Sequence, residues 1–275
     1  GLPYPHTKIV TMDDYKAENY LNLPFDYPVE LKPEDPVSWL NCQFEGRKKA
    51  FTIHDEAELV DIVGKIYTNG YTEEMIIQDC IPGDDSYMRV LTNYSDKNGQ
   101  VKMMCLGHPL LEDPTPQSIG NYMAILPAFS QKLYDTVQSF LEKLNYTGMA
   151  NFDIKYDPRD GEYKFFEINT RQGRSNYYVT GSGFNVARYF VEEFVYNKDI
   201  PFKIAKDEHL WMVVPKAVAR KYVHQPENKE KLNRLIREGK VVNPVFMKGD
   251  FNFNRWLRMV KNHFSHFRKF KTYYH

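Results

Sequence analysis

The chain has no long apolar run and no excess charge of either sign. No stretch reaches the roughly 18 consecutive apolar residues of a membrane-spanning helix, so no transmembrane helix is predicted. No segment has the pattern of a signal peptide. Lysine and arginine together number 36, as do aspartate and glutamate, so their charges cancel. Because no net field would draw the chain to a polyanion, nucleic acid is not a predicted partner.

Cysteine is scarce, and its spacing predicts neither a disulfide framework nor a metal site. Cys42, Cys80 and Cys105 are odd in number and lie far apart. We expect them to stay reduced, as is typical of a cytoplasmic protein. The histidines, among them His54 and His108, show no partner spacing, so neither a zinc site nor a catalytic triad is predicted.

Composition and periodicity predict a folded α+β protein. Apolar residues make up 42% of the 275 positions and aromatic residues 15%, enough for a core divided between two lobes. Hairpins, long strands and single helices follow one another without an orderly strand–helix alternation, which favours α+β. The predicted strands are 7–11, 27–33, 74–81, 87–94, 100–106 and 210–214. The predicted helices are 55–68, 130–144, 185–196 and 226–238, and the predicted irregular segments are 34–46 and 171–183.

Residues 151–170 are the most informative segment, and they predict a β-hairpin with acids on one face. Apolar and polar side chains alternate on either side of a turn at 157–161, which is the period of a half-buried strand. That turn, Asp-Pro-Arg-Asp-Gly, ends in a glycine that can take positive φ. On the polar face we expect Asp153 opposite Glu167, with Asn169 one step along. The apolar face is expected to carry Phe152, Ile154, Tyr156, Phe166 and Ile168.

This polar face is a candidate metal site. Two carboxylates opposed across a strand pair repel each other unless something positive lies between them. With the amide oxygen of Asn169, Asp153 and Glu167 form a set of hard oxygen ligands suited to Mg²⁺. The alternative is an exposed hairpin whose acids align without function, which is the default for an arbitrary hairpin. The neighbouring motifs favour the metal site.

Three motifs resemble those of the ATP-grasp superfamily and, within it, the bacterial carboxylate–amine ligases that include D-aspartate ligase. The first is the strand 27–33, which ends in Lys-Pro. The second is 76–85, Ile-Ile-Gln-Asp-Cys-Ile-Pro-Gly-Asp-Asp, and the third is the acidic hairpin with its Phe-Glu-Ile-Asn. The motifs follow the order of that family, and the resemblance covers residues 1–197.

The resemblance implies an ATP-grasp fold with ATP held between two α+β lobes. Those lobes would be residues 1–83 and 84–200, followed by a C-terminal extension at 201–275. Lys32 would contact the nucleotide phosphates. Gln78 and the backbone of Ile81 would contact the adenine, and Asp85 the ribose. The family's metal motif holds Mg²⁺ or Mn²⁺, and its ligands here would be Asp153, Glu167 and Asn169.

The basic loop after the hairpin supplies candidate catalytic and substrate-binding residues. The resemblance implies that a carboxylate substrate attacks the γ-phosphate to form an acyl phosphate, which an amine then displaces. Arginine matches phosphate and carboxylate with its planar fork. We therefore expect Arg171 and Arg174 to act in catalysis, Arg171 at the transferred phosphate. Arg174 and Ser175 would also bind the substrate carboxylate. The alternative is a solvated basic turn.

The resemblance implies small-molecule carboxylate and amine substrates, with an amino acid and a cell-wall peptidoglycan precursor as the expected pair. One departure favours a different hypothesis, a nucleotide-binding protein without ligase turnover. The family's glycine-rich phosphate loop, usually found shortly after Lys-Pro, has no counterpart in 34–45. A kinase acting on a carboxylate or hydroxyl is a further alternative. The family also carries an upstream domain, which we expect to be missing ahead of Gly1.

The end of the chain, 251–275, predicts a basic amphipathic helix. It contains no acidic residue, and aromatic side chains are interleaved with arginine and lysine. We expect the aromatic side chains to pack onto the body of the protein with the basic residues outside. The alternative is that the helix lies on an anionic membrane surface. That hypothesis would place the protein at the inner face of the membrane, as an interaction module acting through its basic tail.

Overall fold

Two sheets organise the chain, one in each of two units. The computed structural model describes residues 1–246, 249 and 252–274. The smaller unit consists of residues 4–82 and 116–119, and the larger unit of 1–3, 83–115 and 120–275. Phe251 and His275, at the ends of the predicted basic helix, lie outside the described residues.

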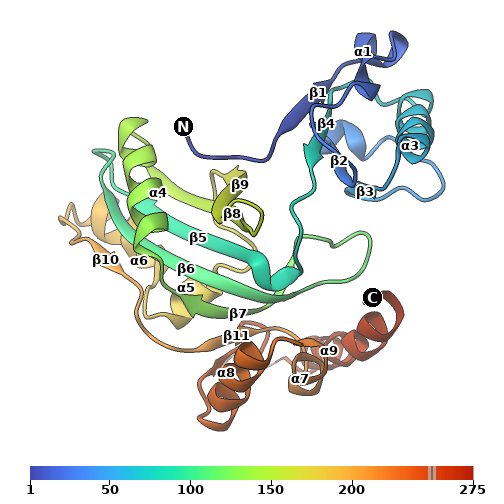
Figure 1. The fold of residues 1–275 in the computed structure, drawn as a ribbon. Helices are drawn as coiled ribbons and strands as arrows, with labels where there is room; N and C mark the ends of the chain where they lie inside the picture. Colours follow the sequence, from blue (N-terminus) through green and yellow to red (C-terminus); the bar gives the residue numbers. More distant parts are fainter. Residues whose placement is uncertain (247–248, 250–251, 275) are drawn as a thin grey trace. The chain divides into compact units, whose positions relative to one another are not determined.

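The smaller unit is built on a four-stranded antiparallel sheet in the order β1-β4-β2-β3 (Figure 1). Its strands are β1 (Thr7–Val10), β2 (Val29–Pro33), β3 (Phe51–Ile53) and β4 (Met75–Asp79). Its helices are α1 (Met12–Lys16), η1 (Asn19–Leu21), α2 (Pro36–Trp39) and α3 (Glu56–Thr68). Leu59 and Val63 of α3 join Leu31 of β2 in one buried core.

Capping explains where two of these helices begin. The side chain of Asp55 accepts a hydrogen bond from the backbone N–H of Glu58, as predicted for the start of α3. The prediction that 34–46 is irregular is wrong at α2. There the carboxylate of Asp35 accepts from the backbone N–H of Val37, and Pro36 occupies the first helical position, where its missing N–H costs nothing.

The larger unit is built on an eight-stranded sheet in the order β12-β11-β7-β6-β5-β8-β9, with β10 paired to β6 (Figure 1). Its first strands are β5 (Met88–Ser95), β6 (Val101–Glu112), β7 (Tyr122–Ala128), β8 (Gly148–Asp157) and β9 (Glu162–Asn169). The short strands β10 (Lys203–Ile204), β11 (Leu210–Met212) and β12 (Val241–Val242) follow. Antiparallel pairs dominate both sheets, so the α+β class is confirmed.

Helices cover both faces of this sheet. They are η2 (Asp85–Tyr87), α4 (Gln131–Lys143), α5 (Tyr177–Gly181), α6 (Val186–Phe190), η3 (Val191–Val195), α7 (Lys216–Tyr222), α8 (Pro226–Arg237) and α9 (Phe253–Tyr273). Leu91 of β5 packs with α4 on one face. Its neighbour Val90 packs with Tyr178 of α5 on the other, as strand alternation requires. Because α5 is helical, the prediction that 171–183 is irregular is wrong for that turn.

Residues 201–275, expected as a C-terminal extension, lie in the larger unit. Strand β11 pairs with β7 of the central sheet. The last helix, α9, buries Phe270 completely in a core with α7 and α8. Among the described residues, no helix is both long enough and apolar enough to cross a membrane.

The acidic hairpin contains a β-bulge, which the predicted regular alternation did not include. Asp153 pairs with Glu167, but the next residue, Ile154, pairs with Phe165, so Phe166 is extra. Phe165 therefore packs in the core, where Phe166 was expected. Ile168 pairs with the buried Phe152 and so lies on the predicted apolar face, although it is 38% exposed there. The pairing of the two acids survives, because the bulge absorbs the extra residue.

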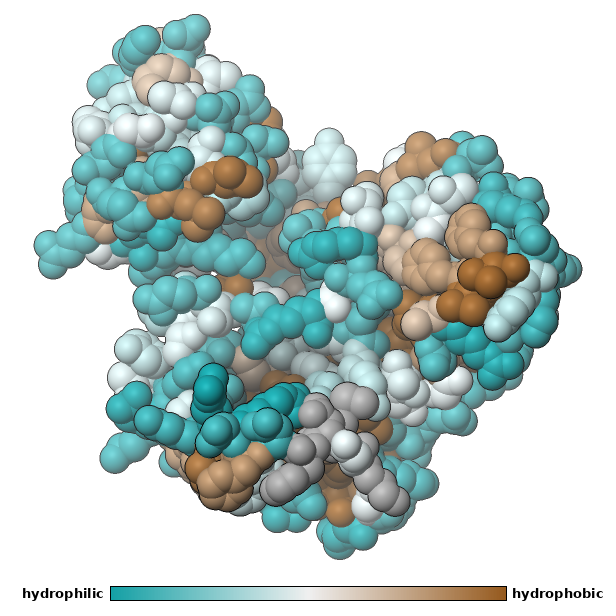
Figure 2. Space-filling model, turned by 180° about the vertical axis from the view of Figure 1, so that it is seen from behind, coloured by the Kyte–Doolittle hydropathy of each residue, from teal (hydrophilic) through white to brown (hydrophobic). Residues whose placement is uncertain are grey.

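An exposed apolar patch lies over α6, η3 and β10, where brown atoms gather in Figure 2. Phe194 and Val195 are 58% and 65% exposed, and Phe202 is 45% exposed. Apolar side chains gathered in one place are the kind of surface that another molecule covers.

Two glycine-to-alanine substitutions should change stability in opposite directions. A Cβ at Gly107 of β6 would lie 2.7 Å from the Cγ2 of Ile125 and 2.9 Å from the Cγ1 of Val90. Gly107→Ala should therefore lower the free energy of unfolding by about 1–3 kcal/mol through overpacking. At Gly64 in α3 the nearest atom is 3.9 Å away, so Gly64→Ala should raise it by about 0.5–1 kcal/mol.

Chemical denaturation of both variants and the parent checks this pair. Equal stability of Gly107→Ala and the parent would contradict the close packing between β6, β5 and β7.

Candidate functional site

The acids of the hairpin face each other at the end of the large sheet. Asp153 of β8 lies directly opposite Glu167 of β9, and the Nδ2 of Asn169 donates to the Oδ2 of Asp153 at 3.2 Å. On its other side Asp153 pairs with Val90. Since Val90 belongs to the face that carries α5, the acids lie on that face and not under α4. The structure thus brings together all three predicted metal ligands.

Tyr122 of β7 holds Asp153 in place from across the sheet. Its hydroxyl donates to the Oδ1 of Asp153 at 2.9 Å. Burial, followed by the negative charge of Asp153, raises the pKa of Tyr122 well above its usual value. The phenol therefore stays protonated and remains a donor. Tyr122 was not predicted as a site residue because no strand was expected at β7, although the run Tyr-Met-Ala-Ile-Leu was an available signal.

Two further carboxylates lie close by. The Oδ2 of Asp85 accepts a hydrogen bond at 2.9 Å from the backbone N–H of Glu112, at the end of β6. Burial, and then the charge of Asp85, raises the pKa of Glu112 to about 7, and the charge of Asp153 acts in the same direction. Burial also raises the pKa of Asp85. Glu112 was not predicted as a site residue. Its position at the end of a long strand, followed by Asp113, was the only sequence signal.

The donor set at the hairpin fits a hard divalent cation. Asp153 and Glu167 supply carboxylate oxygens, and Asn169 supplies an amide oxygen. Among residues 1–246, 249 and 252–274, no three or more His, Cys, Asp or Glu side chains gather into a metal-binding group. A cation held here by two carboxylates and an amide would keep waters or bind phosphate oxygens, which is the preference of Mg²⁺.

The basic loop leads from the hairpin into α5. Arg171 is exposed and donates from Nη1 to the carbonyl of Gln172 at 2.9 Å, while Arg174 is exposed and Ser175 buried. A Cβ at Gly173 would lie 3.0 Å from the Oδ1 of Asn151, so the loop runs closely over β8.

The predicted nucleotide residues divide between the units. In the smaller unit Lys32 of β2 pairs with Ile76, two residues from Gln78 on β4. Lys32 and Gln78 therefore share the sheet face opposite the core of α3. Gln78 is buried and donates from Nε2 to the Oγ1 of Thr7 at 3.0 Å. Ile81 is buried just after β4, and Asp85 belongs to the larger unit.

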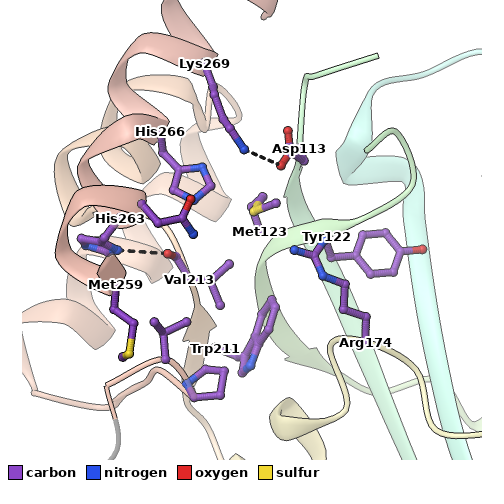
Figure 3. A pocket seen from close by; sticks show the side chains of 13 residues that line it. Asp113, Tyr122, Met123, Arg174, Trp211, Val213, Met259, His263, His266 and Lys269 are labelled. Atoms are coloured by element: carbon purple, nitrogen blue, oxygen red, sulfur yellow. Dashed lines mark hydrogen bonds and ion pairs between the residues drawn. The ribbon is translucent and has the colours of Figure 1, made fainter. Parts of the chain in front are cut away.

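A cavity of about 260 Å³ opens between α9 and the large sheet (Figure 3). The Nζ of Lys269 lies 3.5 Å from the buried Oδ2 of Asp113 at one end. Arg174 reaches in from the loop before α5, and Tyr122 is also among the lining residues. Ser175 is not among the lining residues. This cavity was not predicted from the sequence, because it assembles from segments far apart in the chain. Its lining is Asp113, Tyr122, Met123, Arg174, Trp211, Val213, Pro244, Val245, Met259, Asn262, His263, His266 and Lys269.

Solved structures show which class of protein has this fold. Phosphoribosylamine–glycine ligase from Thermotoga maritima aligns with a TM-score of 0.52 at 12% identity, covering 76% of this chain and 54% of that one. The biotin carboxylase domain of 2-oxoglutarate carboxylase from Hydrogenobacter thermophilus, solved with MgADP, ADP and bicarbonate, aligns with a TM-score of 0.52 at 14% identity. That alignment covers 70% of this chain and 42% of the other. The shared fold is ATP-grasp.

The sequence comparison is more specific. D-aspartate ligase from Enterococcus faecium is 50% identical over the whole chain, and the chain spans 66% of the length of that relative. The large chain of carbamoyl phosphate synthase from Streptomyces griseus is 27% identical over 170 residues. No family model matches the chain. The chain belongs to the carboxylate–amine ligases of the ATP-grasp superfamily.

The buried carboxyl of Glu112 should make stability depend on pH. Its pKa is about 7 in the folded state, against an ordinary value of 4.5, so the folded state binds the proton more tightly. The contribution of Glu112 to stability is therefore fully present below about pH 4.5 and is lost as the pH rises to 7. Glu112→Gln, which does not titrate, should differ little from the parent near pH 5, where most of this contribution remains, and be clearly more stable than it at pH 8.

Thermal unfolding of both proteins at pH 5 and pH 8 measures this difference. Glu230→Gln, a change at an exposed carboxyl on α8, is the control and should show no such pH dependence. A Glu112→Gln effect of equal size at both pH values would show that the burial of Glu112 does not disfavour its charge.

Proposed function

We propose that this chain carries the ATP-dependent chemistry of a ligase that joins the carboxylate of an aspartate to an amine. The observation that carries the proposal is the opposed pair Asp153 and Glu167, with Asn169 beside them and two arginines directly after. This arrangement lies on an ATP-grasp fold in a chain 50% identical to a D-aspartate ligase. The amine would belong to a cell-wall precursor, as the resemblance implies. We expect this reaction to take place in the cytoplasm.

The resemblance assigns four residues to the nucleotide. Lys32 would contact the phosphates, and Gln78 with the backbone of Ile81 the adenine. This is supported by the common face of Lys32 and Gln78 on the small sheet. Asp85 would bind the ribose through Oδ1, because its Oδ2 already accepts the backbone N–H of Glu112.

The metal would bind at Asp153, Glu167 and Asn169. Bound there, Mg²⁺ or Mn²⁺ would neutralise phosphate oxygens during transfer. Tyr122 keeps the Asp153 carboxylate oriented by its hydrogen bond. Binding would replace the contact from the Nδ2 of Asn169 to Asp153, since the amide must then present its oxygen.

The arginines would stabilise charge on the reacting groups. Arg171 is exposed at the end of β9 and would contact the transferred phosphate, where a fixed cation stabilises the transition state. Arg174 would bind the substrate carboxylate. This assignment is supported by the position of Arg174 in the cavity wall. Ser175, buried beside it, would act through the backbone of the loop, because its side chain does not line the cavity.

Glu167→Gln should abolish Mg²⁺-dependent turnover and leave the fold intact. The substitution removes one negative charge from the metal site at nearly constant shape, and Glu167 is exposed, so unfolding should not change. MgATP titrated by calorimetry and phosphate release with aspartate and an amine measure the two effects. Glu162→Gln is the control, because it changes a partly exposed acid of the same strand whose carboxylate accepts from the Nζ of Lys132.

Full turnover by Glu167→Gln would exclude this metal site. MgATP binding without phosphate release, even with both substrates, would favour the nucleotide-binding alternative that the missing glycine-rich loop suggests. Formation of ADP and a phosphorylated product without an amine would favour a kinase.

We propose peripheral membrane contact through 251–275 as a second function. It is supported by the exposed side chains Leu257, Phe264 and Phe267 on α9, which are 46%, 60% and 44% exposed among basic residues. The opposite side of α9 packs inward through the buried His266 and Phe270. The helix thus combines the packing expected for it with an apolar and basic outer face.

The double variant Phe264→Ser/Phe267→Ser should co-sediment severalfold less with anionic vesicles, because it loses two apolar anchors. Point substitutions are preferable to deleting the helix, whose Phe270 is part of the core. Phe129→Ser, at an exposed phenylalanine outside α9, is the control. Unchanged co-sedimentation of the double variant would remove this function.

A further inference from the structure

The cavity between α9 and the large sheet contains buried polar groups without partners. The Nδ1 of His266 and the Nε1 of Trp211 are buried and have no hydrogen-bond partner among the described residues. Both side chains are at least nine-tenths buried, at 5% and 3% exposure, and both line the cavity. Leaving buried polar atoms unpaired is costly, so two such atoms around one cavity indicate a ligand that would satisfy them.

The charges around the cavity select a ligand with one net negative charge. Arg174 and Lys269 are cationic, and Asp113 is anionic, so the lining carries one net positive charge. Thr115 donates to the Oδ1 of Asp113 from its hydroxyl at 2.6 Å. Burial acts to raise the pKa of Asp113, but the hydrogen bonds from Thr115 and the charge of Lys269 outweigh it and lower the pKa. Asp113 therefore stays ionised.

The two histidines of the cavity are neutral. Burial, and then the positive charge of Lys269, lowers the pKa of His266 to about 4, with Arg174 acting in the same direction. Burial also lowers the pKa of His263. The Nδ1 of His263 lies 3.1 Å from the carbonyl of Val213, which can only accept, so Nδ1 donates and Nε2 is left as an acceptor.

The cavity thus offers both donors and acceptors. Arg174, Lys269 and the Nε1–H of Trp211 donate, whereas the Nε2 of His263 and the carboxylate of Asp113 accept. A simple anion would use only the donors. An amino acid with an acidic side chain has two carboxylates and one ammonium, a net charge of −1, and uses both kinds. The volume of about 260 Å³ is below the range of drug-sized ligands and suits a compact molecule.

The cavity is also connected to the candidate metal site. Tyr122 is among the residues that line the cavity, and in Figure 3 its ring extends away from α9 with the hydroxyl at the far end. That hydroxyl donates to Asp153. A single side chain therefore separates the cavity from the carboxylate that would hold the metal.

We propose that this cavity binds the acidic amino-acid substrate, with Arg174, Lys269 and Trp211 holding its carboxylates and His263, His266 and Asp113 facing its ammonium group. The statement that the bound amino acid is a substrate rests on the proposed ligase function. The statement that the cavity binds an acidic amino acid does not. Trp211, His266 and Lys269 would then be specificity-determining residues from the C-terminal part of the chain.

Calorimetric titration of D- and L-aspartate and of the neutral analogue asparagine, each with and without MgADP, tests the proposal. We expect one aspartate enantiomer to bind at least about tenfold more tightly than asparagine, because a charged hydrogen bond is lost in the analogue. Arg174→Gln should weaken aspartate binding at least about tenfold, and Trp211→Phe severalfold.

Two controls separate binding from folding. Arg268→Gln changes an exposed arginine of α9 outside the cavity and should bind aspartate like the parent. Arg174 is itself exposed, so Arg174→Gln should unfold at the temperature of the parent. Lys269→Met is avoided, because it would remove the cation next to the buried Asp113.

The outcomes distinguish this inference from the proposed function. No aspartate binding under either condition, equal affinity for asparagine, or unchanged binding by both Arg174→Gln and Trp211→Phe would overturn the inference. Turnover of aspartate with normal KM in those two variants would overturn it and leave the ligase function standing. Aspartate binding that depends on both residues, in a protein without phosphate release, would support the inference and remove the proposed function.

Discussion

The structure of the candidate site depends on one constraint, the placement of two like charges directly across a strand pair. Asp153 and Glu167 face each other on neighbouring strands, an arrangement that destabilises a sheet when nothing positive is near. The surrounding residues reduce this cost on one side, since Tyr122 and Asn169 both donate to Asp153. Glu167 is left exposed. A site of this kind gains most of its stability when a cation arrives, so ligand binding and local order are expected to be coupled.

Further acids lie near the hairpin, and partial protonation of one of them limits the negative charge of the site. The charges of Asp85 and Asp153 both act on Glu112, and burial is the largest cause that raises its pKa to about 7. A carboxyl that is half protonated near neutral pH lowers the negative charge of the region before a metal is bound. The phosphates of a nucleotide would otherwise approach four unscreened carboxylates. Close to the acids, the cavity under α9 carries the opposite net charge, so the site separates metal ligands from groups that recognise anions.

Local patterns in the sequence predicted much of the fold. The helix predicted at 55–68 corresponds to α3, and the alternation around Asp153 located β8. The bulge at Phe166 was not predictable, because alternation alone implies a regular ladder. Strand β7 was missed for a different reason, since a fully buried strand shows no alternation. Its Tyr122 therefore entered the site only with the structure.

The candidate site was predictable where its residues are close in sequence and not where the fold assembles them. Asp153, Glu167 and Asn169 belong to one hairpin, so turn chemistry and period sufficed to place them together. The cavity needs Asp113, Arg174, Trp211 and α9, which no local pattern relates. The roles of Lys32 and Gln78 came from a resemblance, and the structure adds to them only a shared face of a small sheet.

The bulge in β9 bears on how this hairpin would respond to the loss of single residues. In a regular strand, residues two apart share a face, yet Phe165 is in the core while Glu167 is with the acids. Deleting Phe166 would bring Phe165 and Glu167 into regular register with Ile154 and Asp153 and leave both faces as they are. Deleting Ile168 would instead shift Asn169 out of step with Asp153. A deletion at Phe166 would therefore be tolerated far better than a deletion two residues further along the same strand. In a relative, an alignment gap opposite Phe166 would not indicate that the acidic site is lost.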